Sequence, residues 1–211
     1  MKTWLEKWKV CLKNKETLIS ILFSILFFII SLVINFYASS YANEKASNSV
    51  TDIVLSNIRV FNVDGIFIFG SIAAWIFTAS ILLIEPKRIA FVLKSIALFV
   101  IIRSIFISLT HIGPFPTKAV MDSNGWIATL YSGSDRFFSG HTGLPFLGSL
   151  IFWENKIFRN IFLIMSLMFA IVVLLAHLHY SIDVLGAFFI TYTIFHIALF
   201  LFKKDREMLS K

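Results

Sequence analysis

Long apolar segments separated by short polar connections make up most of the chain. They lie at about residues 17–38, 65–84, 89–110, 142–153, 160–178 and 181–202. About 20 apolar residues in a helix are enough to cross the hydrocarbon core of a bilayer, and backbone groups in lipid must be hydrogen-bonded within the protein. The pattern therefore predicts an all-α integral membrane protein, a bundle of six transmembrane helices whose fourth member is short.

The composition agrees with a membrane location and excludes a small soluble domain held together by disulfides or by a cysteine-bound metal. Hydrophobic residues make up 58% of the 211 residues, charged residues only 15%, and Phe alone occurs 24 times. The mean hydropathy is +0.84. The chain has a single cysteine, Cys11, which excludes an intramolecular disulfide framework and any cluster of cysteines around a metal.

The sequence divides into three segments. Residues 1–16, "MKTWLEKWKVCLKNKE", form a basic amphipathic segment with two Trp residues, which indicates a helix lying at the membrane interface. A positively charged flank of the first span is the alternative interpretation. Residues 17–203 are expected to form one six-span membrane domain, and residues 204–211 a short tail after it.

The distribution of Lys and Arg predicts the orientation. Of the 19 such residues, thirteen lie in the two terminal segments and in the connections after the second and fourth spans. Four lie in the other connections, and Lys94 and Arg103 fall within the third span. Cytoplasmic connections carry the excess of positive charge, so we expect both termini in the cytoplasm. The net charge of +7 is thus a topology signal, and no nucleic-acid partner is expected. Lys94 is expected to extend its amine to the cytoplasmic surface.

Two polar clusters interrupt the apolar pattern on the predicted non-cytoplasmic side. One is "SGSDRFFSGHTG", residues 132–143, and the other is "LAHLHYSIDV", residues 175–184. His179 and Asp183 are spaced i,i+4, so a carboxylate there can accept the imidazole Nδ1 proton and leave Nε2 available as a base or nucleophile. Together with His141 they form a candidate acid, base and nucleophile set.

A structural interpretation of the same residues stays open. Asp183 near the start of a helix is stabilised by the helix dipole alone, and Ser139 suits the N-cap of the fourth helix. Ionisable residues within a membrane are nevertheless functional candidates by default. A transporter or lipid-binding protein that uses the same residues as a proton relay is therefore a non-enzymatic alternative, although no repeated topology supports it.

The ordered motifs resemble the sphingomyelin synthase family, which belongs to the type 2 phosphatidic-acid phosphatase superfamily. The resemblance covers roughly residues 50–195. It rests on "DRFFSGHT" (135–142), "HYSIDVLGAFFIT" (179–191), "RSIFISLT" (103–110) and "PFP" (114–116). The chain departs from the family pattern at five positions, which are Ser134, Leu178, Phe188, Phe189 and Thr193. None of these belongs to the candidate set, but they leave the head group and the acceptor undefined.

The resemblance implies a catalytic triad of His141, His179 and Asp183. His179 would attack phosphorus to form a phosphohistidine-type intermediate, Asp183 would orient it, and His141 would protonate the leaving alkoxide. Five further residues are expected to bind substrate or support the triad: Arg103, Asp135, Arg136, Ser139 and Gly140. Such covalent catalysis needs no cofactor, and we expect no metal site.

Two enzymatic functions fit this set. The phosphatase branch of the superfamily usually carries a K-x6-R-P element and an Arg six residues before the nucleophilic His, whereas this chain has Val173 there and no such element. A dianionic monoester benefits from several cations and a diester needs fewer. We therefore expect transfer of a head group from a phospholipid donor to a lipid-alcohol acceptor, ceramide or another, on the non-cytoplasmic face of a cell membrane. A lipid phosphate phosphatase that uses water is the alternative.

Overall fold

The computed structural model describes residues 3–117 and 137–210, and every regular element in those ranges is helical. Five helices are long and apolar enough to cross a membrane. They are α2 (Lys15–Glu44), α3 (Asp64–Ile84), α4 (Ile89–Leu109), α7 (Lys156–Leu175) and α8 (Ser181–Leu201). The all-α, multi-pass expectation is thus confirmed, while the count of six spans and the cytoplasmic termini stay predictions.

The predicted fourth span is a short helix. Helix α6 (Gly140–Ile151) has 12 residues, a length of about 18 Å against a hydrocarbon core of about 30 Å. It begins at Ser139, whose Oγ accepts the Thr142 backbone N–H at 3.4 Å as an N-cap. The N-cap Ser139 is buried, so the N-terminus of this helix lies within the bundle.

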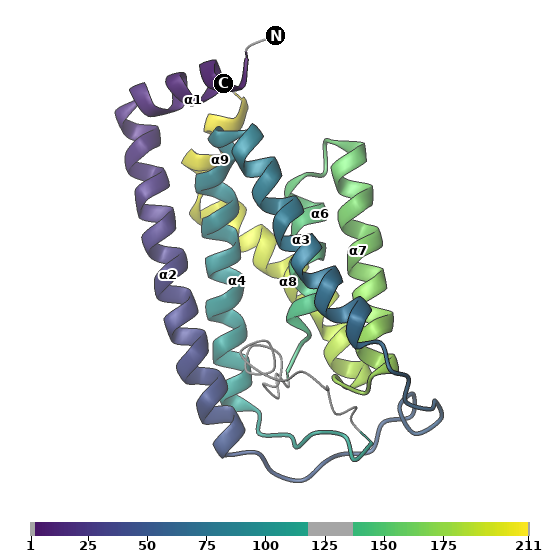
Figure 1. Cartoon of the computed structure of the whole chain (residues 1–211). Coiled ribbons are helices and arrows are strands. Elements are labelled where there is room, and N and C mark those ends of the chain that lie inside the picture. The colour runs from purple at the N-terminus through teal and green to yellow at the C-terminus, as the bar shows by residue number, and fades with distance from the viewer. Residues whose placement is uncertain (1–2, 118–136, 211) are drawn as a thin grey trace.

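Both termini lie at one end of the bundle (Figure 1). Helix α1 (Trp4–Lys13) lies across that end, and the C-terminal helix α9 (Lys203–Ser210) lies at the same end. The indole Nε1 atoms of Trp4 and Trp8 both donate to the Leu83 carbonyl, at 2.7 and 2.8 Å. Helix α1 is thereby attached to the end of α3, and its place at a membrane interface stays a prediction.

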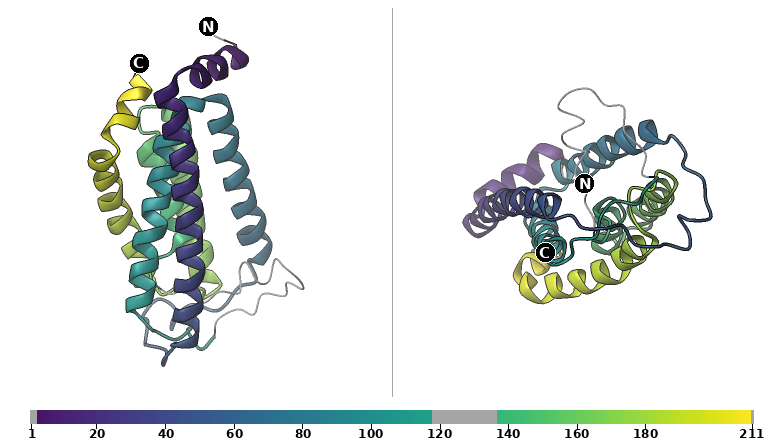
Figure 2. Two further views of the ribbon diagram at one scale, coloured as in Figure 1. Left: turned by 90° about the vertical axis from the view of Figure 1, so that its left-hand side faces the viewer. Right: turned by 90° about the horizontal axis from the view of Figure 1, so that it is seen from below.

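Helix α4 occupies the centre of the bundle, with α2 packed along it and α6, α7 and α8 on its other side (Figures 1 and 2). In its most apolar window 61% of the residues are buried, against 17–33% in the other four candidate spans. The remaining spans therefore turn most of their apolar side chains outwards, as lipid-facing helices do.

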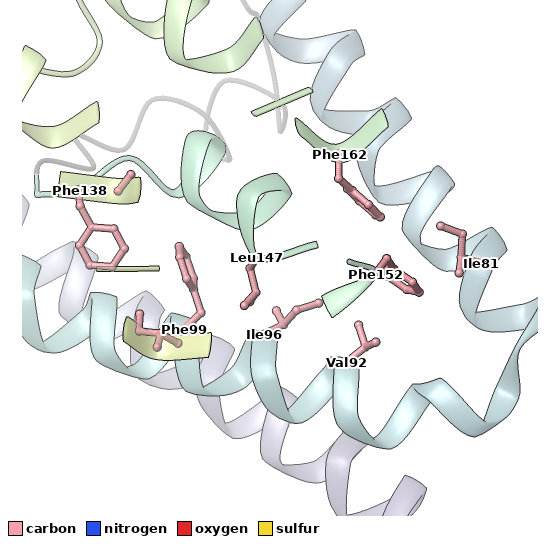
Figure 3. Packing of buried hydrophobic residues seen from close by; sticks show 10 residues of the cluster. Ile81, Val92, Ile96, Phe99, Phe138, Leu147, Phe152 and Phe162 are labelled. Carbon is pink, nitrogen blue, oxygen red and sulfur yellow. The ribbon is translucent and has the colours of Figure 1, made fainter. Parts of the chain in front are cut away.

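An aromatic and aliphatic core runs along α4 and α6 (Figure 3). Phe99 and Phe138 lie at one end of this row, and Phe152 and Phe162 lie at the other. Helix α6 approaches α4 closely because residue 143 is a glycine: a Cβ there would lie 2.8 Å from the Phe99 ring. Any larger residue would push α6, and the polar residues at its N-terminus, away from the centre.

Lys94 does not extend to the surface as expected. Its side chain is buried, and its Nζ contacts Asp205 Oδ2 of α9 at 2.6 Å and Ser20 Oγ of α2 at 2.8 Å. A membrane-buried ammonium group is costly unless it is paired, and the carboxylate that pairs it comes from the C-terminal segment. This ion pair attaches α9 to the centre of the bundle.

Two connections close the opposite end of the bundle. One follows α2 and the other follows α4, and they are joined by backbone bonds from Ser47 to the His111 carbonyl at 2.8 Å and from Gly113 to the Asn48 carbonyl at 3.0 Å. A third bond, from Phe61 N–H to the Leu175 carbonyl at 2.9 Å, joins the first connection to the end of α7. The turn between α7 and α8 is thus hydrogen-bonded to the connection that follows α2, a segment distant in the sequence.

Candidate active site

His179 and Asp183 meet at the start of α8. Asp183 Oδ2 accepts the Tyr180 backbone N–H at 3.0 Å and lies 3.4 Å from His179 Nδ1. Both side chains are buried. The contact arises from a capping turn, because Tyr180 is the N-cap and His179 precedes the helix; the i,i+4 spacing therefore acts across the helix start rather than along a helix face. A proton on Nδ1 leaves the Nε2 lone pair available.

The second carboxylate oxygen of Asp183, Oδ1, has no hydrogen-bond partner among the described residues. This oxygen atom is also buried. Burying a polar atom without a partner is costly, and such atoms in native proteins often mark functional sites. The carboxylate thus keeps unused acceptor capacity next to the imidazole.

Asp52 is a residue that the sequence did not indicate. Its Oδ2 accepts both the backbone N–H of Ser181, at 2.7 Å, and the Ser181 hydroxyl, at 2.8 Å. Its Oδ1 accepts the N–H groups of Val54 and Leu55 at 2.8 and 3.0 Å. Burial alone would raise the pKa of Asp52, but these hydrogen bonds outweigh it and hold the pKa below its ordinary value. Asp52 thus provides the α8 N-terminus with a negatively charged acceptor from another connection.

Tyr180 holds the same turn from its other side. Its hydroxyl donates to the Gly113 carbonyl at 2.9 Å and accepts the Val50 N–H at 3.2 Å. His179 is therefore followed by two residues, Tyr180 and Ser181, that are each bonded to distant segments. This arrangement restricts the backbone on which the imidazole is carried.

The N-terminus of α6 contacts this turn directly. The Ser139 backbone N–H donates to the Asp183 carbonyl at 3.1 Å, so the two polar clusters of the sequence meet. Phe138, just before it, has a positive φ of 28°, a strained conformation for a residue with a large side chain. Its carbonyl accepts a hydrogen bond from Arg103 Nε at 3.1 Å.

Arg103 lies against the start of α6. Its side chain is buried in α4, and a Cβ at Gly140 would come within 3.2 Å of its Nε. The glycine therefore allows a guanidinium group to lie beside a helix N-terminus. Both carry positive charge, and together they suit a phosphoryl group.

His141, the second residue of α6, packs between aromatic rings. Its ring centroid lies 4.3 Å from that of Phe67 and 5.9 Å from that of Phe169. These rings come from α3 and α7, so the orientation of His141 depends on three helices. Phe67 is a contact that the sequence analysis did not single out.

A cavity of about 240 Å³ begins at His141, Arg103 and Gly140 and runs among α2, α3, α4, α6 and α7. Most of its wall is apolar, and its far end is formed by Phe152 and Phe162. His179 and Asp183 do not line it. The structure thus brings Arg103, Gly140 and His141 onto one cavity, and joins Asp183 to it through Ser139.

Two of the expected substrate-binding residues, Asp135 and Arg136, lie outside the described residues, so their roles stay predictions. Another histidine, His177, is buried near this site, and its Nδ1 lies 2.7 Å from the Thr117 hydroxyl. Burial lowers the pKa of His177 below its ordinary value, partly opposed by a hydrogen bond with the Ile58 backbone and by the charge of Asp52. Among the described residues, no group of three His, Cys, Asp or Glu residues could hold a metal ion.

Comparison with known families matches one part of the chain. No curated protein and no solved structure matches the chain. Residues 133–199 match the family model described as PAP2 superfamily C-terminal, and the matched segment includes His141, His179 and Asp183. This domain occurs in sphingomyelin synthase-like proteins.

Proposed function

We propose that this protein is a membrane-embedded transferase that moves a phospho-head group from a glycerophospholipid to a lipid alcohol. The observation that carries the proposal is the position of Arg103 and the α6 N-terminus beside His141, at one end of an apolar cavity within the bundle. A phosphoryl group would be bound at that end, while an acyl chain attached to it would occupy the rest of the cavity.

In the first step, His179 Nε2 attacks phosphorus. A P–N bond forms, and the P–O bond to the glycerol oxygen of diacylglycerol breaks. His141 gives its proton to the leaving oxygen, so diacylglycerol is released as a neutral alcohol. Asp183 keeps the Nδ1 proton in place and stabilises the positive charge that the imidazole acquires.

In the second step, the hydroxyl of the lipid acceptor attacks the phosphohistidine. His141, now neutral, accepts the hydroxyl proton while the new P–O bond forms and the P–N bond breaks. This returns His179 to its starting state with no net change in protons. Each proton transfer by a positioned group contributes typically about 10²–10⁴-fold to the rate.

The cation content of the site supports a diester donor. Among the described residues that line the cavity, Arg103 is the only Lys or Arg. One guanidinium group and a helix N-terminus match the single charge of a phosphodiester better than the two charges of a monoester. The apolar wall likewise favours a lipid hydroxyl over bulk water as the acceptor.

The proposal is tested with the purified protein in nanodiscs that contain a phospholipid labelled in its head group and a candidate lipid alcohol such as ceramide. We expect the label to appear in a new lipid and unlabelled diacylglycerol to accumulate in equal amount. His179→Ala is the inactive control, and His196→Ala, an exposed histidine of α8, is the matched active control.

Two results would contradict the transferase proposal. Label found only in water-soluble phosphocholine or phosphoethanolamine would mean that water is the acceptor. Phosphatidic acid consumed much faster than any diester would establish the lipid phosphatase alternative, which the superfamily also includes.

A further inference from the structure

A second cavity lies at the end of the bundle that carries the termini, far from the residues described above. It has a volume of about 690 Å³ and is bounded by η1 (Pro86–Arg88), α4, the end of α6, the connection from α6 to α7, α8 and α9. Its wall is apolar along α8 and charged at the rim. No residue of the candidate active site lines it.

The rim of this cavity carries more positive than negative charge. Arg88, Lys203 and Arg206 line it together with two acidic residues, Glu154 and Glu207. One of these acids is already engaged, since Lys203 Nζ lies 3.8 Å from Glu207 Oε1. The excess of one positive charge complements a head group that carries one negative charge.

The cationic face of α9 is held in a defined position. Lys203 and Arg206 are spaced i,i+3 and so share one side of the helix. Asp205 lies between them in the sequence and points into the bundle, where it is ion-paired with Lys94 at 2.6 Å. Because α9 is attached through Asp205, the two cations are presented to the cavity by a fixed element.

The apolar wall has the depth of one lipid leaflet. It runs along α8 from Leu199 through Phe195 to Tyr192, and Tyr192 lies nine positions before Leu201, the last residue of α8, or about 14 Å along the helix. Half of the hydrocarbon core measures about 15 Å. Trp153 at the rim is 53% exposed, which suits a residue at the membrane–water interface.

We infer that this cavity binds one anionic glycerophospholipid of the leaflet on the side of the termini, with its phosphate at Arg88 and Arg206 and an acyl chain along α8. Basic pockets between transmembrane helices bind acidic phospholipids in this way. The bound lipid would join α4, α8 and α9 at the end opposite the candidate active site. The inference is independent of the proposed reaction.

The experiment measures lipid retention by native mass spectrometry of the intact protein in detergent, with dioleoyl phosphatidylglycerol and dioleoyl phosphatidylcholine as probes. We expect the wild-type protein to retain one phosphatidylglycerol at concentrations where it retains no additional phosphatidylcholine. Removal of one cation near an anionic head group weakens binding about fivefold, so Arg88→Gln with Arg206→Gln should weaken it about thirtyfold.

Two further variants separate the contributions. Lys9→Gln with Lys13→Gln removes two exposed charges from α1 at the same end of the bundle, and it should leave retention unchanged. Leu199→Trp keeps every charge but fills the apolar wall, and it should abolish retention. Arg206→Gln alone, at an exposed position, should weaken binding about fivefold in a protein that remains folded.

Three outcomes would overturn the inference. An equal loss in the α1 control would mean non-specific attraction to the basic end of the bundle. Binding of soluble glycerol 3-phosphate as tight as that of phosphatidylglycerol would mean an anion site without a lipid chain. Full retention by Leu199→Trp would place the lipid elsewhere on the protein.

Discussion

The bundle contains two buried ionic clusters, one at each end, and they differ in how completely their atoms are paired. At the end with the termini, Lys94 Nζ contacts Asp205 Oδ2 at 2.6 Å and Ser20 Oγ at 2.8 Å, and the Ser20 hydroxyl donates to the other Asp205 oxygen. At the opposite end, Asp183 lies 3.4 Å from His179 and, among the described residues, its Oδ1 has no partner.

The difference in pairing indicates a structural role for the Lys94–Asp205 cluster and a chemical role for the His179–Asp183 cluster. A closed ring of charge and hydrogen bonds leaves nothing to bind a ligand, and its members can only hold segments together. In the His179–Asp183 cluster, a carboxylate oxygen is buried without a hydrogen bond to any described residue, and this lowers the stability of the fold. We therefore expect substitutions in the first cluster to reduce stability and substitutions in the second to reduce turnover.

The largest expected effect is on turnover at the open cluster. His179→Ala should reduce head-group transfer by more than about 10⁴-fold, because it removes the covalent route as well as an acid–base group. The melting temperature should change little, since no closed network is broken. Transfer assays and thermal unfolding of the same preparation test this, with His196→Ala as the matched histidine control. Turnover close to wild type in His179→Ala would contradict the nucleophile assignment.

The largest effect on stability is expected at the closed cluster. Lys94→Met leaves Asp205 buried without its counterion and should cost about 3–5 kcal/mol of unfolding free energy. The double variant Lys94→Met with Asp205→Leu should recover most of that loss, because it buries no charge. Denaturant unfolding measures both, and turnover per folded molecule should stay near wild type. A loss of turnover without a loss of stability would contradict the structural role.

An intermediate effect on both turnover and stability is expected at Asp52. This residue belongs to neither cluster, but it binds the first residue of α8, Ser181. Asp52→Asn should cost about 1.5–3 kcal/mol, the value of hydrogen bonds to a charged acceptor, and should lower turnover about tenfold by loosening the backbone next to His179. Glu44→Gln, an exposed carboxylate at the same end, is the control and should be neutral.

The stability difference between wild type and Asp52→Asn should depend on pH, which gives a second test of the role of Asp52. The folded-state pKa of Asp52 lies below its ordinary value, so its contribution is complete above the unfolded-state pKa of about 3.9. It is lost as the pH falls through the folded-state pKa. The gap between wild type and Asp52→Asn should be constant near neutral pH and should shrink only in strong acid. A gap that closes between pH 6 and 7 would point to another group.

The smallest effect is expected in the cavity that leads away from the open cluster. Ala74 of α3 lines this cavity, whereas its neighbour Ala73 is exposed and does not. Ala74→Phe should lower kcat/KM for long-chain donors about tenfold, since one blocked apolar contact is worth about 1–3 kcal/mol, and should spare short-chain donors. Ala73→Phe should leave both unchanged. Equal losses for long and short chains would mean that the cavity does not hold an acyl chain.

The sequence alone was sufficient to predict features that depend on local composition. The apolar segments predicted an all-α multi-pass protein because only helices of this length satisfy their backbone in lipid. The motifs around His141 and His179 indicated the same superfamily as the match over residues 133–199. Ser139 was predicted as the α6 N-cap because capping depends on the adjacent residues.

The tertiary structure decided which distant groups meet. Asp52 binds Ser181 across 129 positions, and Lys94 binds Asp205 across 111; nothing in the local pattern of either carboxylate indicates its partner. The sequence suggested that Lys94 would reach the surface because a lone charge in a span usually does, and only the fold brings α9 back to pair it. The cavity behind His141 and the lipid-sized cavity at the other end likewise depend on how five or more segments pack, which no single segment encodes.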